Sequence, residues 1–172
     1  MKDIYVDFKA GGIKGDSKDK DHAGTVEVTS FSHEIRQPKS ATSSTAGGHT
    51  SERVEHGEMI FTKDIDFASP ALLVACSSGT VIKDVEIHFY RAFGSNTAGG
   101  SQNRKKYWAI KLKNVIVASV SNVISGEGLP GETFSLKYSA IEWSYDEIKV
   151  DGSQGNKMTK QWNLQNNTPT FA

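Results

Sequence analysis

Residues Phe61 to Gly79 read FTKDIDFASPALLVACSSG and contain the only segment of the chain in which both ends of a helix are marked by the sequence. Ser69 is a residue type that caps the first backbone amides of a helix. Pro70 fits the first helical position, where a missing N–H costs nothing. Gly79 suits the left-handed conformation that ends many helices. The sequence therefore predicts a two-turn helix that is capped by Ser69, begins at Pro70 and stops at Gly79.

This predicted helix is hydrophobic around nearly its whole circumference, because every residue from Ala71 to Cys76 is apolar. A helix of that kind has to be covered on more than one side. A sheet of the same subunit can cover one side, which leaves the other for a long loop or for another protein chain. Cys76 is the only cysteine, so no intramolecular disulfide is possible, and its place in the helix favours packing over thiol chemistry.

The length and charge of the chain limit its class. A chain of 172 residues is most simply one domain, residues 1–172, with room for a substantial core. Lysine plus arginine number 20, as do aspartate plus glutamate, so the formal net charge is zero. The chain lacks the excess of positive charge that binding to nucleic acid or an anionic membrane requires. The N-terminus lacks the apolar region of a signal peptide, and no stretch is long enough to span a bilayer. Folding in the cytoplasm is therefore expected.

Apolar and polar residues alternate in several segments, as in strands with one buried face, and residues 4–8 are the first example. In three longer segments the apolar positions move to the other face part-way along: near Thr29, within residues 108–120 and within residues 134–145. A bulge or strong coil at such points bends a sheet toward closure. The pattern predicts a mainly β fold of about seven strands. They either curl into a barrel or are buried on both faces for part of their length.

A long connection, PKSATSSTAGGHTS at residues 38–51, is rich in small residues and joins two predicted strands. A connection of this length without secondary structure of its own is uncommon in a compact domain and is usually functional or disordered. Two interpretations stay open. The segment is either the tip of a flexible hairpin or an arm that orders against a neighbouring molecule.

No segment carries a recognisable catalytic or cofactor-binding motif. The charged turn at residues 15–24, GDSKDKDHAG, holds three aspartates and a histidine, but lysines lie between them and EF-hand spacing is absent. A solvated loop is predicted there. Glu142 and Asp146 are one of many acidic pairs that chance produces, and neither His49 nor His56 has the carboxylate pattern of a catalytic base. The sequence therefore predicts neither an enzyme nor a cofactor or metal.

Five segments, taken in this order, resemble the haemolysin-coregulated protein (Hcp) family of type VI secretion systems. They are GDSKDKDHAG, the strand Phe31-Ser32-His33 with its exit Arg36-Gln37-Pro38, FTKDIDFASPALLVACSSG, VIVASVS and KQWNLQNN. The resemblance runs from Met1 to the last strand. It implies two sheets closed into a β-barrel with one short α-helix on its side, and six such subunits in a head-to-tail ring.

The resemblance also implies partners. Rings of this family stack into a tube that carries effectors in its bore. A contractile sheath drives the tube, and a spike protein sits at its tip. The segment from Pro38 to Arg53 matches the arm that contacts neighbouring subunits, so we expect contacts from Pro38, Lys39, Ser40, His49 and Arg53. Ser32 matches the small polar residue that faces the bore.

The function predicted from the sequence is that of a tube subunit which is cytoplasmic before firing and is then secreted without a signal peptide, to the exterior or into a target cell. The chain ends soon after its last strand, so no C-terminal toxin domain is expected. The alternative is a monomeric β-barrel module that binds a small ligand or a glycan. That function needs a cavity lined by residues such as Trp108, Trp143 and Trp162, and these occupy core-like positions.

Overall fold

The structure is a computed structural model that describes residues 2–10, 12–38, 53–93, 103–126, 128, 130–149 and 152–171. These residues form one helix, α1 (Ser69–Ser78), and eleven strands. The strands are β1 (Lys2–Phe8), β2 (Val26–Val28), β3 (Ser30–Ser32), β4 (Ile35–Arg36), β5 (Glu55–His56), β6 (Met59–Asp64), β7 (Ile82–Phe93), β8 (Asn103–Val123), β9 (Gly131–Lys137), β10 (Ala140–Ile148) and β11 (Gln154–Asn163). The predicted mainly β architecture with one short helix is confirmed.

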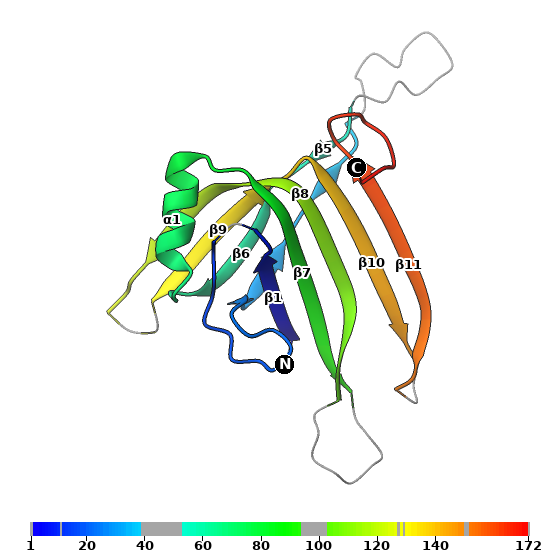
Figure 1. Cartoon of the computed structure of the whole chain (residues 1–172), viewed down its shortest axis with the longest axis horizontal. Coiled ribbons are helices and arrows are strands. Elements are labelled where there is room, and N and C mark those ends of the chain that lie inside the picture. Colours follow the sequence, from blue (N-terminus) through cyan, green and yellow to red (C-terminus); the bar gives the residue numbers. More distant parts are fainter. Residues whose placement is uncertain are drawn as a thin grey trace.

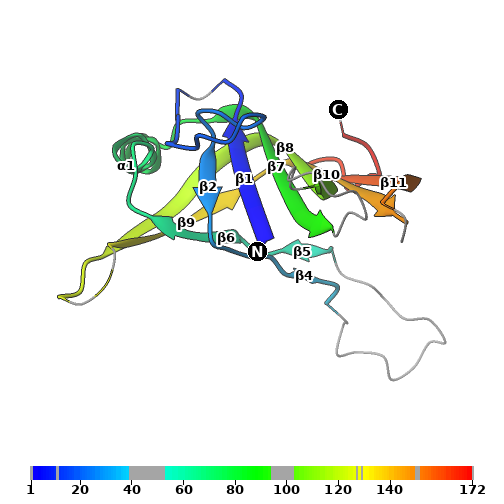
Figure 2. The ribbon, with the colours of Figure 1, turned by 90° about the horizontal axis from the view of Figure 1, so that it is seen from below.

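Two sheets face each other and share strand β8 (Figures 1 and 2). The first runs β2-β1-β7-β8-β10-β11, and the second runs β8-β9-β6-β3. The early part of β8 pairs with β7 and β10, whereas residues 116–123 pair with β9. A separate ribbon of two strands, β4 and β5, extends below the sheets.

The prediction that the two sheets close into a barrel is wrong. In the described part of the chain, β2 and β3 are the two ends of the path β2-β1-β7-β8-β9-β6-β3 and do not pair with each other. They are successive segments of one stretch with only Thr29 between them, so no ladder can form across them. The Thr29 N–H donates to the carbonyl of Thr62 at 2.7 Å, where the chain passes from one sheet to the other. The sheets are joined there by backbone and not by strand pairing.

The predicted changes of face lie at irregular points in the strands. Near Thr29 the chain changes its partner from β1 to β6. In β8, Asn114 has a φ of 50°, and this left-handed residue allows Leu112 and Val115 to point into the same core although they are three residues apart. The segment at residues 134–145 is two strands, because β9 ends at Lys137 and β10 begins at Ala140.

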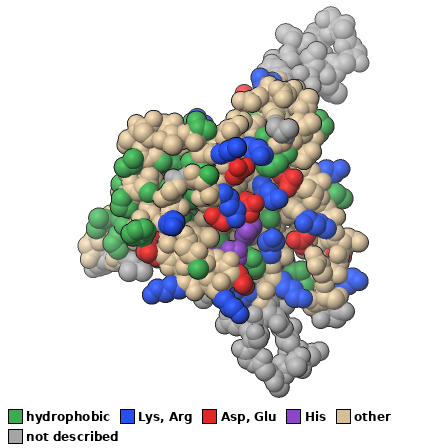
Figure 3. Space-filling model, in the orientation of Figure 1, with side chains coloured by type: hydrophobic (Ala, Val, Ile, Leu, Met, Phe, Trp, Pro, Cys, Tyr) green, Lys and Arg blue, Asp and Glu red, His purple; other side chains and the backbone are tan. Residues whose placement is uncertain are grey.

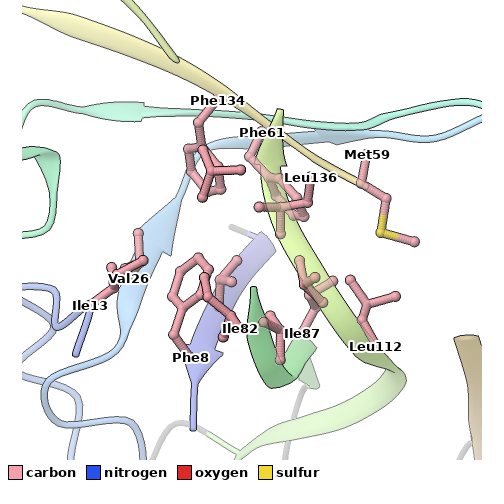
Figure 4. Packing of buried hydrophobic residues seen from close by; sticks show 14 of the residues in the cluster. Phe8, Ile13, Val26, Met59, Phe61, Ile82, Ile87, Leu112, Phe134 and Leu136 are labelled. Carbon is pink, nitrogen blue, oxygen red and sulfur yellow. The ribbon is translucent and has the colours of Figure 1, made fainter. Parts of the chain in front are cut away.

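The core lies between the sheets (Figure 4). Phe61 and Phe134 stack at 4.9 Å between ring centroids on the second sheet, and both are fully buried. Val6 and Ile87 are also fully buried and come from the first sheet. Burial of large apolar side chains from both sheets is the main source of stability, because each contributes about 1.5 to 3 kcal/mol.

Helix α1 packs against β8 and buries Leu72 and Ala75. Its predicted end is confirmed, because Gly79 has a φ of 63° and its N–H donates to the carbonyl of Ala75. The prediction that Ser69 caps the helix is wrong, since Ala68 occupies the N-cap position. Cys76 is half-buried and packs against the core. In the described residues, no helix combines the length and the apolar character needed to cross a membrane.

Candidate functional site

A buried polar network fixes the start of helix α1. Lys63 Nζ lies 2.9 Å from Glu132 Oε1 and 2.6 Å from Asp66 Oδ1, and it donates to Ser69 Oγ at 3.0 Å. The Lys63 and Glu132 side chains are fully buried. Asn122 donates to the other Glu132 oxygen at 2.9 Å. These bonds engage the Ser69 hydroxyl, which explains why it does not cap the helix.

Exposed apolar residues lie around this helix, and we call them the helix surface. It consists of exposed hydrophobic residues on α1, on the segments that flank it and at the end of β8: Phe67, Leu73, Val74, Val81, Val123 and Ile124. Phe67 is 71% exposed and Val74 is 66% exposed, although both are apolar. Hydrophobic side chains gather at this end of the molecule in Figure 3. Exposed apolar side chains that gather in one region of a surface mark it as an interaction site.

A second apolar feature, the aromatic hollow, lies on β8, β10 and β11. It is a shallow pocket of about 300 Å³ lined by Trp108, Trp143, Tyr145, Met158 and Lys160. Tyr145 pairs with Trp108 across one strand boundary and with Met158 across the other, so the hollow follows from strand register. The helix and the β10–β11 wing lie at opposite ends of the molecule in Figure 1. Two different apolar surfaces therefore lie at opposite ends of the subunit.

The structure brings together only two of the three tryptophans that were candidates for a ligand cavity. Trp108 and Trp143 line the aromatic hollow, whereas Trp162 is not in its lining and pairs with Ile141. All three are partly buried and pack against the core. The sequence reasoning missed Tyr145 and Met158, which period-two alternation places on the same face as the two tryptophans.

A histidine–tyrosine cluster joins the β4–β5 ribbon to the sheets. The Tyr138 hydroxyl lies 2.9 Å from His33 Nε2 and 2.7 Å from His56 Nδ1. His56 also packs on Trp143, with ring centroids 6.3 Å apart. Burial lowers the pKa of His33, and burial together with the nearby His33 lowers that of His56. These residues are 105 and 82 positions from Tyr138 in the chain, so no local pattern could reveal the cluster.

The charged turn at residues 15–24 is less solvated than predicted. His22 is buried, stacks on Tyr5 at 4.5 Å and bonds to the Tyr90 hydroxyl at 2.7 Å. Arg104 forms ion pairs with Asp19 and with Asp3 of β1. The turn is thus pinned to the outer face of the first sheet. In the ranges that the structure describes, no three His, Cys, Asp or Glu side chains come together as a metal site would require.

The predicted contact residues are distributed as follows. Ser32 is exposed on the edge strand β3, and Pro38 is half-buried after β4. Arg53 is exposed and donates to the carbonyl of Gln165 at 3.4 Å. The remaining predicted contacts lie outside the described residues: Lys39, Ser40 and His49. The roles of all six remain predictions.

The acidic pair noted in the sequence has structural partners. Glu142 lies 3.5 Å from Lys111 Nζ, and Asp146 lies 3.8 Å from Lys157 Nζ, both across neighbouring strands. Opposite charges that face each other across strands stabilise a sheet by tenths of a kcal/mol, roughly 0.2 to 1. The geometry therefore gives these carboxylates a role in strand pairing.

Comparison with known proteins gives the family. Residues 5–145 match the family model described as "Type VI secretion system effector, Hcp". The chain belongs to the Hcp family. It is 34% identical over 167 residues to Protein hcp1 of Pseudomonas aeruginosa, with 96% of each chain covered. It is 30% identical over 146 residues to the Major exported protein of the same organism, covering 81% of this chain and 79% of the relative.

Solved structures agree with the Hcp assignment. Hcp1 of Salmonella typhimurium superposes with a TM-score of 0.76 at 26% identity, covering 98% of this chain and 99% of that one. A structure described as a type six secretion system protein has a TM-score of 0.81 at 23% identity, with 98% and 99% covered, and this likeness supports the fold alone. The resemblance seen in the sequence is confirmed, and the chain is a type VI secretion system Hcp protein.

Proposed function

We propose that this Hcp protein is a single-domain tube subunit that associates head to tail into six-membered rings, and that these rings stack into the tube of the secretion system. The observation that carries the proposal is the pair of unlike apolar surfaces at opposite ends of the subunit, the helix surface and the aromatic hollow. Unlike surfaces that complement each other produce heterologous contacts, which close into a ring when the rotation permits. The helix surface of one copy then covers the hollow of the next.

The remaining parts of the proposal follow from family membership. The tube carries effectors in its bore, with Ser32 facing them, and it is secreted together with a spike protein after a contractile sheath drives it. Pro38, Lys39, Ser40, His49 and Arg53 contact neighbouring subunits. A relative named Major exported protein supports secretion of this chain.

The decisive experiment is native mass spectrometry and negative-stain microscopy of the purified chain and two single variants. Val74→Asp places a carboxylate on the helix surface at a side chain that is 66% exposed, so the subunit still folds. Its burial in an interface costs several kcal/mol. We expect the parent to form rings, Val74→Asp to be monomeric and the control Ala92→Asp, at an exposed site near the end of β7, to form rings. A parent that stays monomeric at micromolar concentration contradicts the proposal.

A ligand-binding module is the second candidate, because Trp108 and Trp143 line the same hollow and can stack on a sugar or another flat ligand. A monomeric parent whose tryptophan fluorescence saturates with one glycan would favour this function. Rings seen by microscopy favour the tube subunit.

A further inference from the structure

The Tyr138 hydroxyl is held between two histidine rings from different elements. His33 follows β3, His56 lies in β5 and Tyr138 follows β9, so the three residues connect the β4–β5 ribbon to the second sheet. Tyr138 is buried, and the two histidines are half-buried with ring centroids 6.0 Å apart. We call this set the histidine–tyrosine clamp.

The hydrogen bonds of the clamp can all be satisfied when both histidines are neutral. His33 also bonds to the backbone of Gly57, and this bond raises the pKa of His33, as a ring N–H that donates to a carbonyl does. His33 Nε2 is then the acceptor for the Tyr138 hydroxyl hydrogen. The Tyr138 oxygen keeps its lone pairs for the N–H of His56 Nδ1.

Protonation breaks this arrangement. An imidazolium has two donors and no acceptor, so the Tyr138 hydroxyl loses its partner when His33 gains a proton. A buried polar group without a partner is costly. A second proton on His56 adds a like charge at 6.0 Å between centroids. Burial already lowers the pKa of both rings, which shows that their site disfavours the charged form.

Two of the three carboxylates around the clamp form ion pairs with other residues. Glu34 pairs with Arg36 at 2.8 Å, and Glu58 pairs with Lys137 at 3.2 Å. Glu55 lines an open hollow next to His56, together with Glu34 and Arg36. The other face of His56 meets the Trp143 ring, beyond which lies Lys160. Neither of these ion pairs includes a histidine of the clamp, and the positive charge of Lys160 opposes protonation of His56.

We infer that the histidine–tyrosine clamp is a pH-sensitive latch that holds the β4–β5 ribbon against the sheets at neutral pH and releases it in mild acid. His56 also supports Trp143, a wall of the aromatic hollow. Release therefore alters the surface that receives the next subunit, and acid weakens the association of subunits. This last consequence rests on the proposed function.

The latch is tested first in a chain that cannot associate, Val74→Asp. Imidazole NMR signals followed from pH 8 to pH 4.5 report protonation of each histidine, and the ring contacts of Tyr138 report release. We expect His33 and His56 to titrate below pH 6.5 together with loss of the Tyr138 contacts. Tyr138→Phe, which keeps the ring and removes the hydroxyl, moves the His33 midpoint upward, because neutral His33 then loses the hydrogen bond that it accepts. Midpoints at the value of a free histidine, unchanged in Tyr138→Phe, overturn the latch.

Association is tested by sedimentation of the full chain at pH 7.5 and pH 5.5. We expect the dissociation constant to rise at least tenfold in acid, and we expect His33→Gln with His56→Gln to remove that dependence. His22→Gln is the matched control, since His22 also bonds a tyrosine but lies on the outer face of the first sheet, and it keeps the dependence. A chain that is monomeric at both pH values contradicts the proposed function and leaves the NMR result to decide the latch. Rings unaffected by pH contradict the latch.

Discussion

Substitution of Lys63 by methionine isolates the energetic role of the buried network beneath helix α1. The change removes the ammonium group and leaves the fully buried Glu132 carboxylate with only two neutral donors, Ser69 at 3.2 Å and Asn122 at 2.9 Å. Breaking a buried ion pair from one side costs about 3 to 5 kcal/mol, because the remaining charge is uncompensated. For a domain of 172 residues, this loss corresponds to a fall in Tm of roughly 6 to 20 °C.

The assay is urea unfolding followed by tryptophan fluorescence, in the Val74→Asp background so that dissociation of subunits does not add to the free energy. We expect Lys63→Met with Glu132→Gln to recover at least half of the loss, since neither charge then remains alone. Lys137→Met is the control, because that lysine pairs with Glu58 but is 59% exposed, and its loss costs under about 1 kcal/mol. A Lys63→Met chain within about 1 kcal/mol of its parent would refute this reasoning.

Two further predictions concern single sites. Burial, followed by the charge of Lys106, lowers the pKa of His88 from 6.5 to about 4. The unfolded chain therefore binds more protons between these values, and stability falls as pH falls through this window, by up to about 3 kcal/mol at 1.36 kcal/mol for each unit. Urea unfolding of His88→Gln at several pH values should show a shallower decline, and an unchanged slope contradicts the assignment. At Gly15 an added Cβ would lie 2.3 Å from the Thr25 carbonyl oxygen, so Gly15→Ala should cost about 1 to 3 kcal/mol. Gly126→Ala, with open space around it, should cost less, and equal losses in thermal unfolding would contradict the contact.

Local sequence signals predicted one end of helix α1 but not the other. Its end could be predicted because Gly79 alone supplies the left-handed residue that stops it. Its cap could not be predicted, because the Ser69 hydroxyl is engaged by Lys63 and Glu132, and Glu132 is 63 residues away. Period-two alternation places Lys63 on the buried face of β6 with Met59 and Phe61, but it cannot reveal Glu132, the distant partner that compensates the buried charge.

The strands show the same limit at a larger scale. The change of face near Thr29 was visible in the sequence, but whether it closes a barrel depends on which strands meet at the two ends of the order. Of the two candidate surfaces, only the helix surface had a signal in the sequence. The apolar character of α1 predicted that more than one side of the helix is covered, but not that Leu73 and Val74 lie on the side left open by the subunit. The aromatic hollow needs the register of three strands before Trp108 and Trp143 come together.

Strand β8 has a consequence for how the subunit unfolds. Its 21 residues belong to both sheets, and three strands besides helix α1 depend on it for their position. Neither sheet can therefore separate while the other stays intact, because both contain β8. Unfolding of β8 disrupts the packing of the whole core. We therefore expect the two sheets to unfold together as one cooperative unit, whereas the separate β4–β5 ribbon can open on its own.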